Sequence, residues 1–343
     1  MTCNPLRALV TTLALLLVLG GCTTATLDKT ATPAEAGYAL PPATSGTLAD
    51  IARAIQSEHG EEYSGFKVLD SSFDGLQWRL ALIDSATTSL DIQTYLWYPD
   101  NSGRLILERA FQAAQRGVKV RLIVDDLILH GYDQLIANLD ATENIEFRIF
   151  NPWENRGSLL DRAGEMLARM ERLNTRMHSK LVIADGHAAI VGGRNIGDHY
   201  FGLHETYNFH DTDLLGIGNL ALQANGMFDM FWNSRWVAPG SALSTAANRD
   251  KALEQLAAVQ KSIRKAPQLA AFPREVADWT AELTALAPTL HPGRSKLVYD
   301  ETADEQIEQR MVSSMFNFYN IATEELLIQN AYIIPGDQAV EFL

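Results

Sequence analysis

The stretch Met177–Tyr200 reads MHSKLVIADGHAAIVGGRNIGDHY and predicts a β-hairpin with polar residues before and after it. Two short, apolar, β-prone runs flank Asp185-Gly186, which is a tight-turn signal. His178 and Lys180 precede the first run, and side chains two residues apart on an extended segment point to one face. Gly192-Gly193 ends the second run and lets the backbone approach a bound group. The hairpin therefore places a candidate nucleophile beside a fixed cation.

These residue types fit phosphate chemistry. His178 could attack phosphorus or shuttle a proton. Lys180 and Asn195 could hold the non-bridging oxygens by charge and by amide hydrogen bonds, so we expect no metal or other cofactor. An isolated H-x-K is more often a strand histidine beside a surface lysine. The full string H-x-K-x4-D-x6-G-G-x-N is a far more specific motif than H-x-K alone.

That string resembles the signature of the phospholipase D superfamily, and GGRNIGDHYFG is similar to the bacterial cardiolipin synthase and phospholipase D-like lipoprotein branch. The resemblance implies phosphatidyl transfer or phospholipase D hydrolysis on membrane phospholipids, through a phosphohistidine. It makes His178 the nucleophile or its acid partner, and Lys180 and Asn195 the phosphate clamp. It makes Asp211 the acid that orients a catalytic histidine, the alternative being a turn or edge residue. Asp185 belongs to the signature but lies too far along the strand to share the face of His178, which favours a structural role.

The length, composition and charge of the chain limit its domain number and its class of substrate. The chain has 343 residues, enough for two domains, and its 47% hydrophobic and 20% charged residues are typical of globular proteins. The net charge of −14 makes nucleic acid an unfavourable partner, because proteins that grip nucleic acid present a basic face. A nucleic-acid phosphodiesterase of the same superfamily and a non-catalytic, lipid-binding surface lipoprotein nevertheless remain alternatives to the phospholipid enzyme.

The N-terminus has the features of a secretion signal. Ala8–Leu19 is a twelve-residue apolar run, which suits a signal peptide and is too short to span a bilayer. It leads to Leu19-Gly20-Gly21-Cys22, which resembles a bacterial lipoprotein cleavage box with Cys22 as the lipidated residue. The alternative is an ordinary signal peptide cut elsewhere. We expect a signal peptide at 1–21, a flexible tether at 22–47 and an outer-membrane anchor on the periplasmic side of the cell envelope. The other cysteine is Cys3, so no disulfide framework is expected.

From residue 48 the pattern is that of an α/β protein. Helical and strand patterns alternate through Leu76–Ser85, Ser89–Tyr98, Arg104–Arg116 and Val118–Val124, and later through Tyr132–Leu139, Ile145–Phe150, Leu159–Leu173, Phe209–Gly218 and Leu220–Trp236. This alternation predicts a phospholipase D-like fold, with a mixed, largely parallel sheet flanked by helices. We place a first repeat at 48–240 and a helical connector at 241–290. Asp125 and Asp126 follow a strand, where they either face a ligand or cap a helix.

Histidines cluster around the hairpin, which makes a metal centre the obvious rival. The chain places His178, His187, His199, His204 and His210 within one short stretch. No pair has the H-x3-H spacing, and neither cysteine is close in sequence. A zinc site is therefore the weaker alternative.

The last part of the chain resembles the first. At an offset of 236, Ala86-Thr87, Leu90 and Ile92-Gln93 recur as Ala322-Thr323, Leu326 and Ile328-Gln329. Chance similarity of two βα units is the alternative. We expect 291–343 to begin a second phospholipase D-like repeat that the chain ends within, with a strand at Leu326–Ile334. The family's second H-x-K motif is then expected near position 414 of the same polypeptide, with a homodimer as the less favoured source.

Overall fold

The structure is a computed structural model that describes residues 35–157, 159–302, 307–308 and 310–328. The chain divides into two compact units, Met1–Leu297 and Val298–Leu343, which we describe separately. Within the described ranges, no helix combines the length and the hydrophobicity needed to cross a bilayer. The apolar run Ala8–Leu19, Cys22 and the first half of the expected tether lie outside the described residues.

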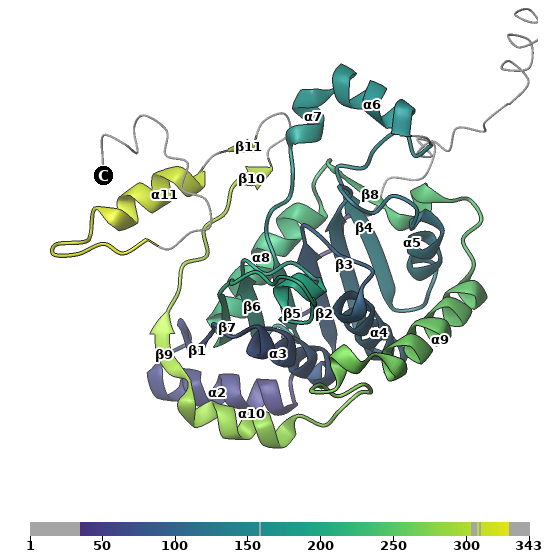
Figure 1. The fold of residues 1–343 in the computed structure, drawn as a ribbon. Coiled ribbons are helices and arrows are strands. Elements are labelled where there is room, and N and C mark those ends of the chain that lie inside the picture. Colours follow the sequence, from purple (N-terminus) through teal and green to yellow (C-terminus); the bar gives the residue numbers. More distant parts are fainter. Residues whose placement is uncertain (1–34, 158, 303–306, 309, 329–343) are drawn as a thin grey trace, which may run out of the picture. The chain divides into compact units, whose positions relative to one another are not determined.

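The first unit is built on a mixed sheet of nine strands in the order β8-β4-β3-β2-β5-β6-β7-β1-β9 (Figure 1). The strands are β1 (Tyr63–Leu69), β2 (Ser89–Thr94), β3 (Lys119–Asp125), β4 (Ile145–Phe150), β5 (Leu181–Ala184), β6 (Ala188–Gly192), β7 (Asp213–Gly218), β8 (Val237–Pro239) and β9 (His291–Arg294). The α/β class and the helix-flanked mixed sheet predicted from the sequence are confirmed.

Parallel pairing is confined to β2, β3 and β4; the other six ladders of the sheet are antiparallel. The expectation of a largely parallel sheet is therefore wrong in its proportions. Helices join β2 to β3 and β3 to β4, which permits parallel crossovers, whereas the Asp185-Gly186 turn forces β5 and β6 to run antiparallel. The segment between β4 and β5 starts and ends at the edge of the sheet where β2, β3 and β4 end. The first residue of β5 therefore lies beside the end of β2, and β5 runs antiparallel to β2.

Helices cover both faces of the sheet (Figure 1). They are α2 (Thr47–His59), α3 (Ser72–Ser85), α4 (Asn101–Gln115), α5 (Asp133–Asp140), α6 (Leu159–Ala168), α7 (Met170–Asn174), α8 (Asn219–Trp232), α9 (Arg249–Lys265) and α10 (Thr280–Leu286). Leu90 and Ile92 of β2 belong to the apolar core. Asp91 lies between them in sequence and pairs with Arg121 of β3, which also pairs with Asp229 of α8. Side chains alternate across a strand, so β2 presents an apolar face to one layer and a polar face to α8.

Several helices and strands have other bounds than the sequence pattern predicts. The strand expected at Ser89–Tyr98 stops at Thr94, and the helix expected at Leu159–Leu173 is divided into α6 and α7. The segment 241–290 is helical, as α9 and α10, and its Leu256, Ile263 and Leu283 are part of the core of the first unit. The sheet continues beyond it to β9, which pairs with β1.

The second unit contains β10 (Glu301–Thr302), β11 (Ile307–Glu308) and α11 (Arg310–Tyr319). The 236-residue offset would place the counterpart of α3 where α11 lies. Residues 326–328 of the strand expected at Leu326–Ile334 have no regular structure, and the rest of it lies outside the described residues.

Candidate functional site

Antiparallel pairing gathers the predicted site residues at one edge of the sheet. The first residue of β5 pairs with the end of β2, through Leu181 and Gln93. The end of β6 lies beside the start of β5, and the start of β7 lies beside the end of β6. Because β3 and β4 run parallel to β2, they end at this edge as well. We call it the catalytic edge.

His178 lies just before β5, with its ring exposed and packed against Tyr95, the residue that follows β2. The two ring centroids are 4.2 Å apart. Desolvation and, second, the nearby Lys180 charge lower the pKa of His178, whereas the main chain of Arg176 acts in the opposite direction. The ring is therefore neutral near pH 7, which is the form that can act as a nucleophile.

Lys180 sits beside this ring, as the H-x-K spacing predicts. Its ammonium donates to the carbonyl oxygen of His178 and lies 5.4 Å from the centroid of the Tyr95 ring. Burial lowers the pKa of Lys180, and the opposing charges are those of Asp211 and Asp213. Tyr95 thus contacts both members of the H-x-K pair. No site role was predicted for Tyr95, although an aromatic residue that follows a strand at a ligand edge was a usable signal.

Asn195 is held in place by two neighbours. Its side-chain oxygen accepts a hydrogen bond of 3.0 Å from the Leu96 amide, and its side-chain nitrogen donates one of 2.8 Å to the Tyr200 hydroxyl. An amide nitrogen has two N–H groups, so Asn195 can donate to Tyr200 and to a phosphate oxygen together. The first contact holds Asn195 near the end of β2, because Leu96 is the residue after Tyr95 in the chain.

Asp211 faces Lys180 rather than His178. Lys180 and Arg194 are among the charged groups that act on Asp211, and the hydrogen bonds of the described residues include none between Asp211 and His178. A Cβ atom at Gly193 would lie 2.4 Å from an Asp211 carboxylate oxygen, so glycine lets this side chain come close to the backbone. Burial raises the pKa of Asp211, with a further contribution from the charge of Asp213. The role of Asp211 as the orienting acid of His178 stays a prediction.

Asp185 lies at the opposite edge of the sheet. Its carboxylate accepts hydrogen bonds of 2.7–3.0 Å from the amides of Thr87, Thr88 and Ser89 and from the Thr87 hydroxyl. Asp185 has a positive φ of 56°, which the tight turn after β5 requires. The structural role expected for this signature residue agrees with its place, and it does not join the site.

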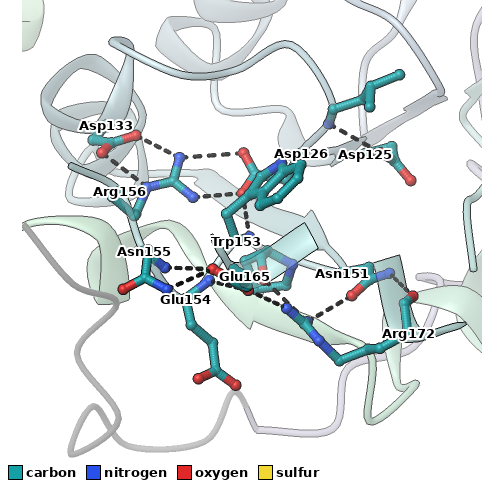
Figure 2. Close-up of polar contacts among 12 residues, drawn as sticks. Asp125, Asp126, Asp133, Asn151, Trp153, Glu154, Asn155, Arg156, Glu165 and Arg172 are labelled. Carbon is teal, nitrogen blue, oxygen red and sulfur yellow. Dashed lines mark hydrogen bonds and ion pairs between the residues drawn. The ribbon is translucent and has the colours of Figure 1, made fainter. Parts of the chain in front are cut away.

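Asp125 and Asp126 lie at the catalytic edge, but neither caps a helix. The N-cap position of α5 is Tyr132. Asp125 accepts hydrogen bonds from the Arg176 side chain (3.0 Å) and from the Met177 amide (3.1 Å). Asp126 forms an ion pair with Arg156, which Figure 2 shows between Asp126 and Asp133. Both acids therefore bind protein groups.

A polar network supports the segment that leads to His178 (Figure 2). Glu165 of α6 accepts from the Asn155 amide and from Arg172. The Asn151 side chain donates to the carbonyl oxygens of Arg172 (2.7 Å) and Thr175 (2.6 Å). Asn151 directly follows β4, so its bonds join this segment to the sheet.

The histidines outside the H-x-K motif do not assemble a metal site. His199 packs on His204, with ring centroids 3.8 Å apart, and stacks on Tyr207. His187 instead contacts the Ala43 carbonyl oxygen. Across the part of the chain that the structure describes, no group of three or more His, Cys, Asp or Glu side chains is arranged to hold a metal ion.

The chain is similar to several known proteins. A family model described as "Cardiolipin synthase, PLD-like domain" matches residues 80–232, from α3 to the end of α8. An uncharacterized protein of Helicobacter pylori is 33% identical over 283 residues, which are 82% of this chain and 56% of that protein. Cardiolipin synthase C of Escherichia coli is 39% identical over 192 residues, 56% of this chain and 40% of that enzyme. The chain thus spans about half the length of the curated relatives it matches.

Among solved structures, the phosphatidylserine synthase of Haemophilus influenzae aligns with a TM-score of 0.41 at 14% identity, over 63% of this chain and 48% of that one. NucT of Helicobacter pylori aligns with a TM-score of 0.37 at 20% identity, over 50% of this chain and 96% of that one. The family model, the match to cardiolipin synthase C and the H-x-K-x4-D-x6-G-G-x-N string inside the matched region together identify the family. The chain belongs to the phospholipase D superfamily, with a PLD-like domain of the cardiolipin synthase type at residues 80–232.

Proposed function

We propose that this protein is a phosphatidyltransferase or phospholipase D-type phosphodiesterase that acts on membrane phospholipids, with His178 as its nucleophile. The observation that carries the proposal is the group at the catalytic edge. There the His178 imidazole and the Lys180 ammonium lie beside the Tyr95 ring, and the Asn195 side chain binds the amide of the next residue, Leu96. Such a group can attack a phosphodiester and hold its charged oxygens without a metal ion.

The reaction proceeds in two displacements. A ring nitrogen of His178 attacks phosphorus, the bond from phosphorus to the leaving alcohol oxygen breaks, and that oxygen takes a proton from a general acid. An acceptor hydroxyl then attacks the phosphohistidine and gives its proton to the same group, which now acts as a general base. The nitrogen–phosphorus bond breaks, which restores His178. Lys180 and Asn195 stabilise the negative charge of both transition states. The acceptor is water, glycerol or a second phospholipid.

The general acid is a second histidine in this proposal. By analogy with the family, we propose that it comes from a second H-x-K segment in the same polypeptide, or from a second copy of this chain. Asp211 is a weaker choice, because it faces Lys180 and not the imidazole. Phospholipid is favoured over nucleic acid because the net charge of −14 opposes the binding of a polyanion.

The test is lipid mass spectrometry after full-length protein is incubated with phosphatidylglycerol vesicles. The wild type and His59→Ala, a control at the end of α2, are expected to convert the lipid. His178→Ala and Lys180→Ala are expected to slow conversion by about a thousandfold or more. Equal turnover by His178→Ala and wild type contradicts the assignment of the nucleophile. Cleavage of single-stranded DNA in place of the lipid favours the nuclease alternative, and lipid binding without conversion favours a non-catalytic lipoprotein.

A further inference from the structure

The second half of the expected tether is bound to the first unit. Residues 35–46, which we call the strap, precede α2 and have no regular secondary structure. Near the end of the strap, the Ala43 amide donates to the Asp185 carbonyl oxygen at 3.0 Å, and the His187 ring contacts the Ala43 carbonyl oxygen at 2.7 Å. Both partners lie in the turn between β5 and β6. The strap therefore ends at the edge of the sheet opposite the catalytic edge.

Two side chains of α8 bind the earlier part of the strap. Asn233 accepts from the Gly37 amide at 2.9 Å and donates to the Gly37 carbonyl oxygen at 2.8 Å. Asp229, one turn earlier on the same face of the helix, accepts from the Ala39 amide at 2.9 and 3.1 Å. A Cβ atom at Gly37 would lie 2.9 Å from the Trp232 ring nitrogen, so glycine lets the strap lie against this ring. The main chain of the strap is thus held along α8.

The direction of α8 decides where the strap begins. Because β7 starts at the catalytic edge and ends at the opposite one, α8 runs back toward the catalytic edge. The carbonyl oxygens of Trp232, at the end of α8, and of Glu35 both accept from the Arg148 guanidinium at 2.6 Å. Arg148 lies in β4, two residues before this strand ends at the catalytic edge. The described chain therefore starts beside the catalytic edge and crosses to the opposite edge before α2.

An apolar surface lies at the catalytic edge as well. α6 and α7 belong to the connection from β4 to β5, and Figure 1 shows them beyond this edge of the sheet. Their side chains Met166, Leu167 and Met170, which we call the α6–α7 patch, are 49%, 80% and 50% exposed. Large apolar side chains gain free energy when they enter the boundary between lipid headgroups and acyl chains. The net charge of −14 opposes adsorption to anionic lipid by charge, so apolar contact suits this protein better.

We propose that the catalytic edge is the face that lies against a phospholipid bilayer, oriented by the strap and by the α6–α7 patch. The inference rests on the lipid attachment expected at Cys22. Cys22 and Glu35 are thirteen positions apart, so a coil between them would span about 20 Å. With the strap bound, this short coil joins the domain beside the catalytic edge. If the strap were free, the tether would instead reach the domain at α2, on the opposite side of the sheet.

The first test is fluorescence of full-length, lipidated protein in phosphatidylglycerol vesicles that carry a quencher on the lipid headgroups. The two cysteines of the chain are Cys3, in the expected signal peptide, and Cys22, under the expected lipid, so an introduced cysteine is the single site for a dye. Leu167→Cys reports on the α6–α7 patch, and Lys119→Cys, at the exposed start of β3, reports on the opposite edge. We expect severalfold stronger quenching at position 167. Equal quenching at both positions, or stronger quenching at position 119, overturns the inference.

The second test releases the strap with the double variant Gly37→Val, Asn233→Ala. It places a side chain against Trp232 and removes both Asn233 bonds to the strap, so the difference between the two dye positions should shrink. Asn219→Ala is the matched control, because it makes the same change at the first residue of α8, which contacts Glu62 instead. Amide hydrogen exchange of residues 35–46 measures the release. Rapid exchange of these amides in the wild type, or an unchanged dye difference after release, overturns the role of the strap.

The third test is turnover. Release of the strap should slow the conversion of phosphatidylglycerol in vesicles severalfold and leave the conversion of detergent-dispersed lipid unchanged, because orientation matters only at a bilayer. An equal loss on both substrates contradicts the role of the strap. Quenching needs no turnover, so a wild type that is quenched at position 167 but converts no lipid refutes the proposed function alone. Self-association by light scattering, with no quenching at position 167, identifies a second copy as the occupant of the α6–α7 patch and overturns the inference.

Discussion

At the residue scale, the proposed chemistry depends on a neighbouring histidine and lysine whose pKa values are both lowered. The Lys180 charge lowers the pKa of His178, and partial burial lowers the pKa values of both groups. The imidazole must be neutral to attack phosphorus, whereas the ammonium must be charged to bind the phosphate oxygens. The lowered pKa of His178 favours the first condition near neutral pH, and the Asp211 and Asp213 charges help to keep Lys180 protonated.

This pairing predicts the pH dependence of turnover. The rate should rise with pH as His178 loses its proton, with a midpoint below its usual pKa of 6.5. It should fall again as Lys180 loses its proton, with a midpoint below 10.5. In Lys180→Met, the pKa of His178 measured by NMR titration should move upward, because a positive neighbour has been removed. An acid limb above pH 6.5 in the wild type, or a downward shift in Lys180→Met, would contradict the assignment.

At the element scale, Asp185 joins the end of β5 to the start of β2. Its carboxylate binds three successive amides, from Thr87 to Ser89, and these precede or begin β2. Since Tyr95 directly follows β2 at the catalytic edge, the register of β2 against β5 decides where Tyr95 meets His178. Asp185 therefore affects the site only by holding two strands together at their far ends.

Replacement of Asp185 should thus weaken the fold more than the chemistry. Asp185→Ala leaves several amides without an acceptor and should lower the free energy of unfolding by about 3 kcal/mol or more. Asp185→Asn keeps one acceptor and tolerates the positive φ, so its loss should be smaller. Urea denaturation measures both, and kcat of the folded fraction should stay within about threefold of wild type. A thousandfold loss of kcat at wild-type stability would instead place Asp185 in the chemistry.

At the scale of the whole molecule, the proposed substrate requires the protein to meet a membrane. We propose attachment through lipid on Cys22, which leaves the domain at the periplasmic face of a bacterial envelope membrane, with the outer membrane favoured. Phospholipid headgroups would then reach the catalytic edge from the surface to which the protein is tethered. The net charge of −14 disfavours electrostatic adsorption to anionic lipid, so a covalent anchor would supply the attachment.

This proposal predicts the behaviour of two cysteine variants. Cys22→Ser should move the protein from the membrane pellet to the soluble fraction in high salt, because the apolar run Ala8–Leu19 is too short to span a bilayer. Cys3→Ser is the matched control and should remain with the membranes. Fractionation with immunoblotting measures both. Quantitative sedimentation of Cys22→Ser with membranes would refute the lipid anchor.

The sequence by itself determined the local elements and the identity of the chemical groups. Apolar runs and turn residues lie within a few positions of each other, so the β5–β6 hairpin around Asp185-Gly186 was predictable from local pattern alone. The H-x-K spacing likewise placed His178 beside Lys180, because the alternation of side chains is a property of any extended segment. The α/β class followed from the same local periodicities.

Only the tertiary structure decided how distant segments meet. Strand direction depends on the path of each connection, so the sequence did not show that most ladders are antiparallel or that the end of β3 lies beside the His178 segment. Tyr95 and Asp125 reach this edge through such long-range packing, although each lies at the end of a strand, where a ligand edge is expected. The distance between two side chains is set by the sheet, and their separation along the chain does not reveal it.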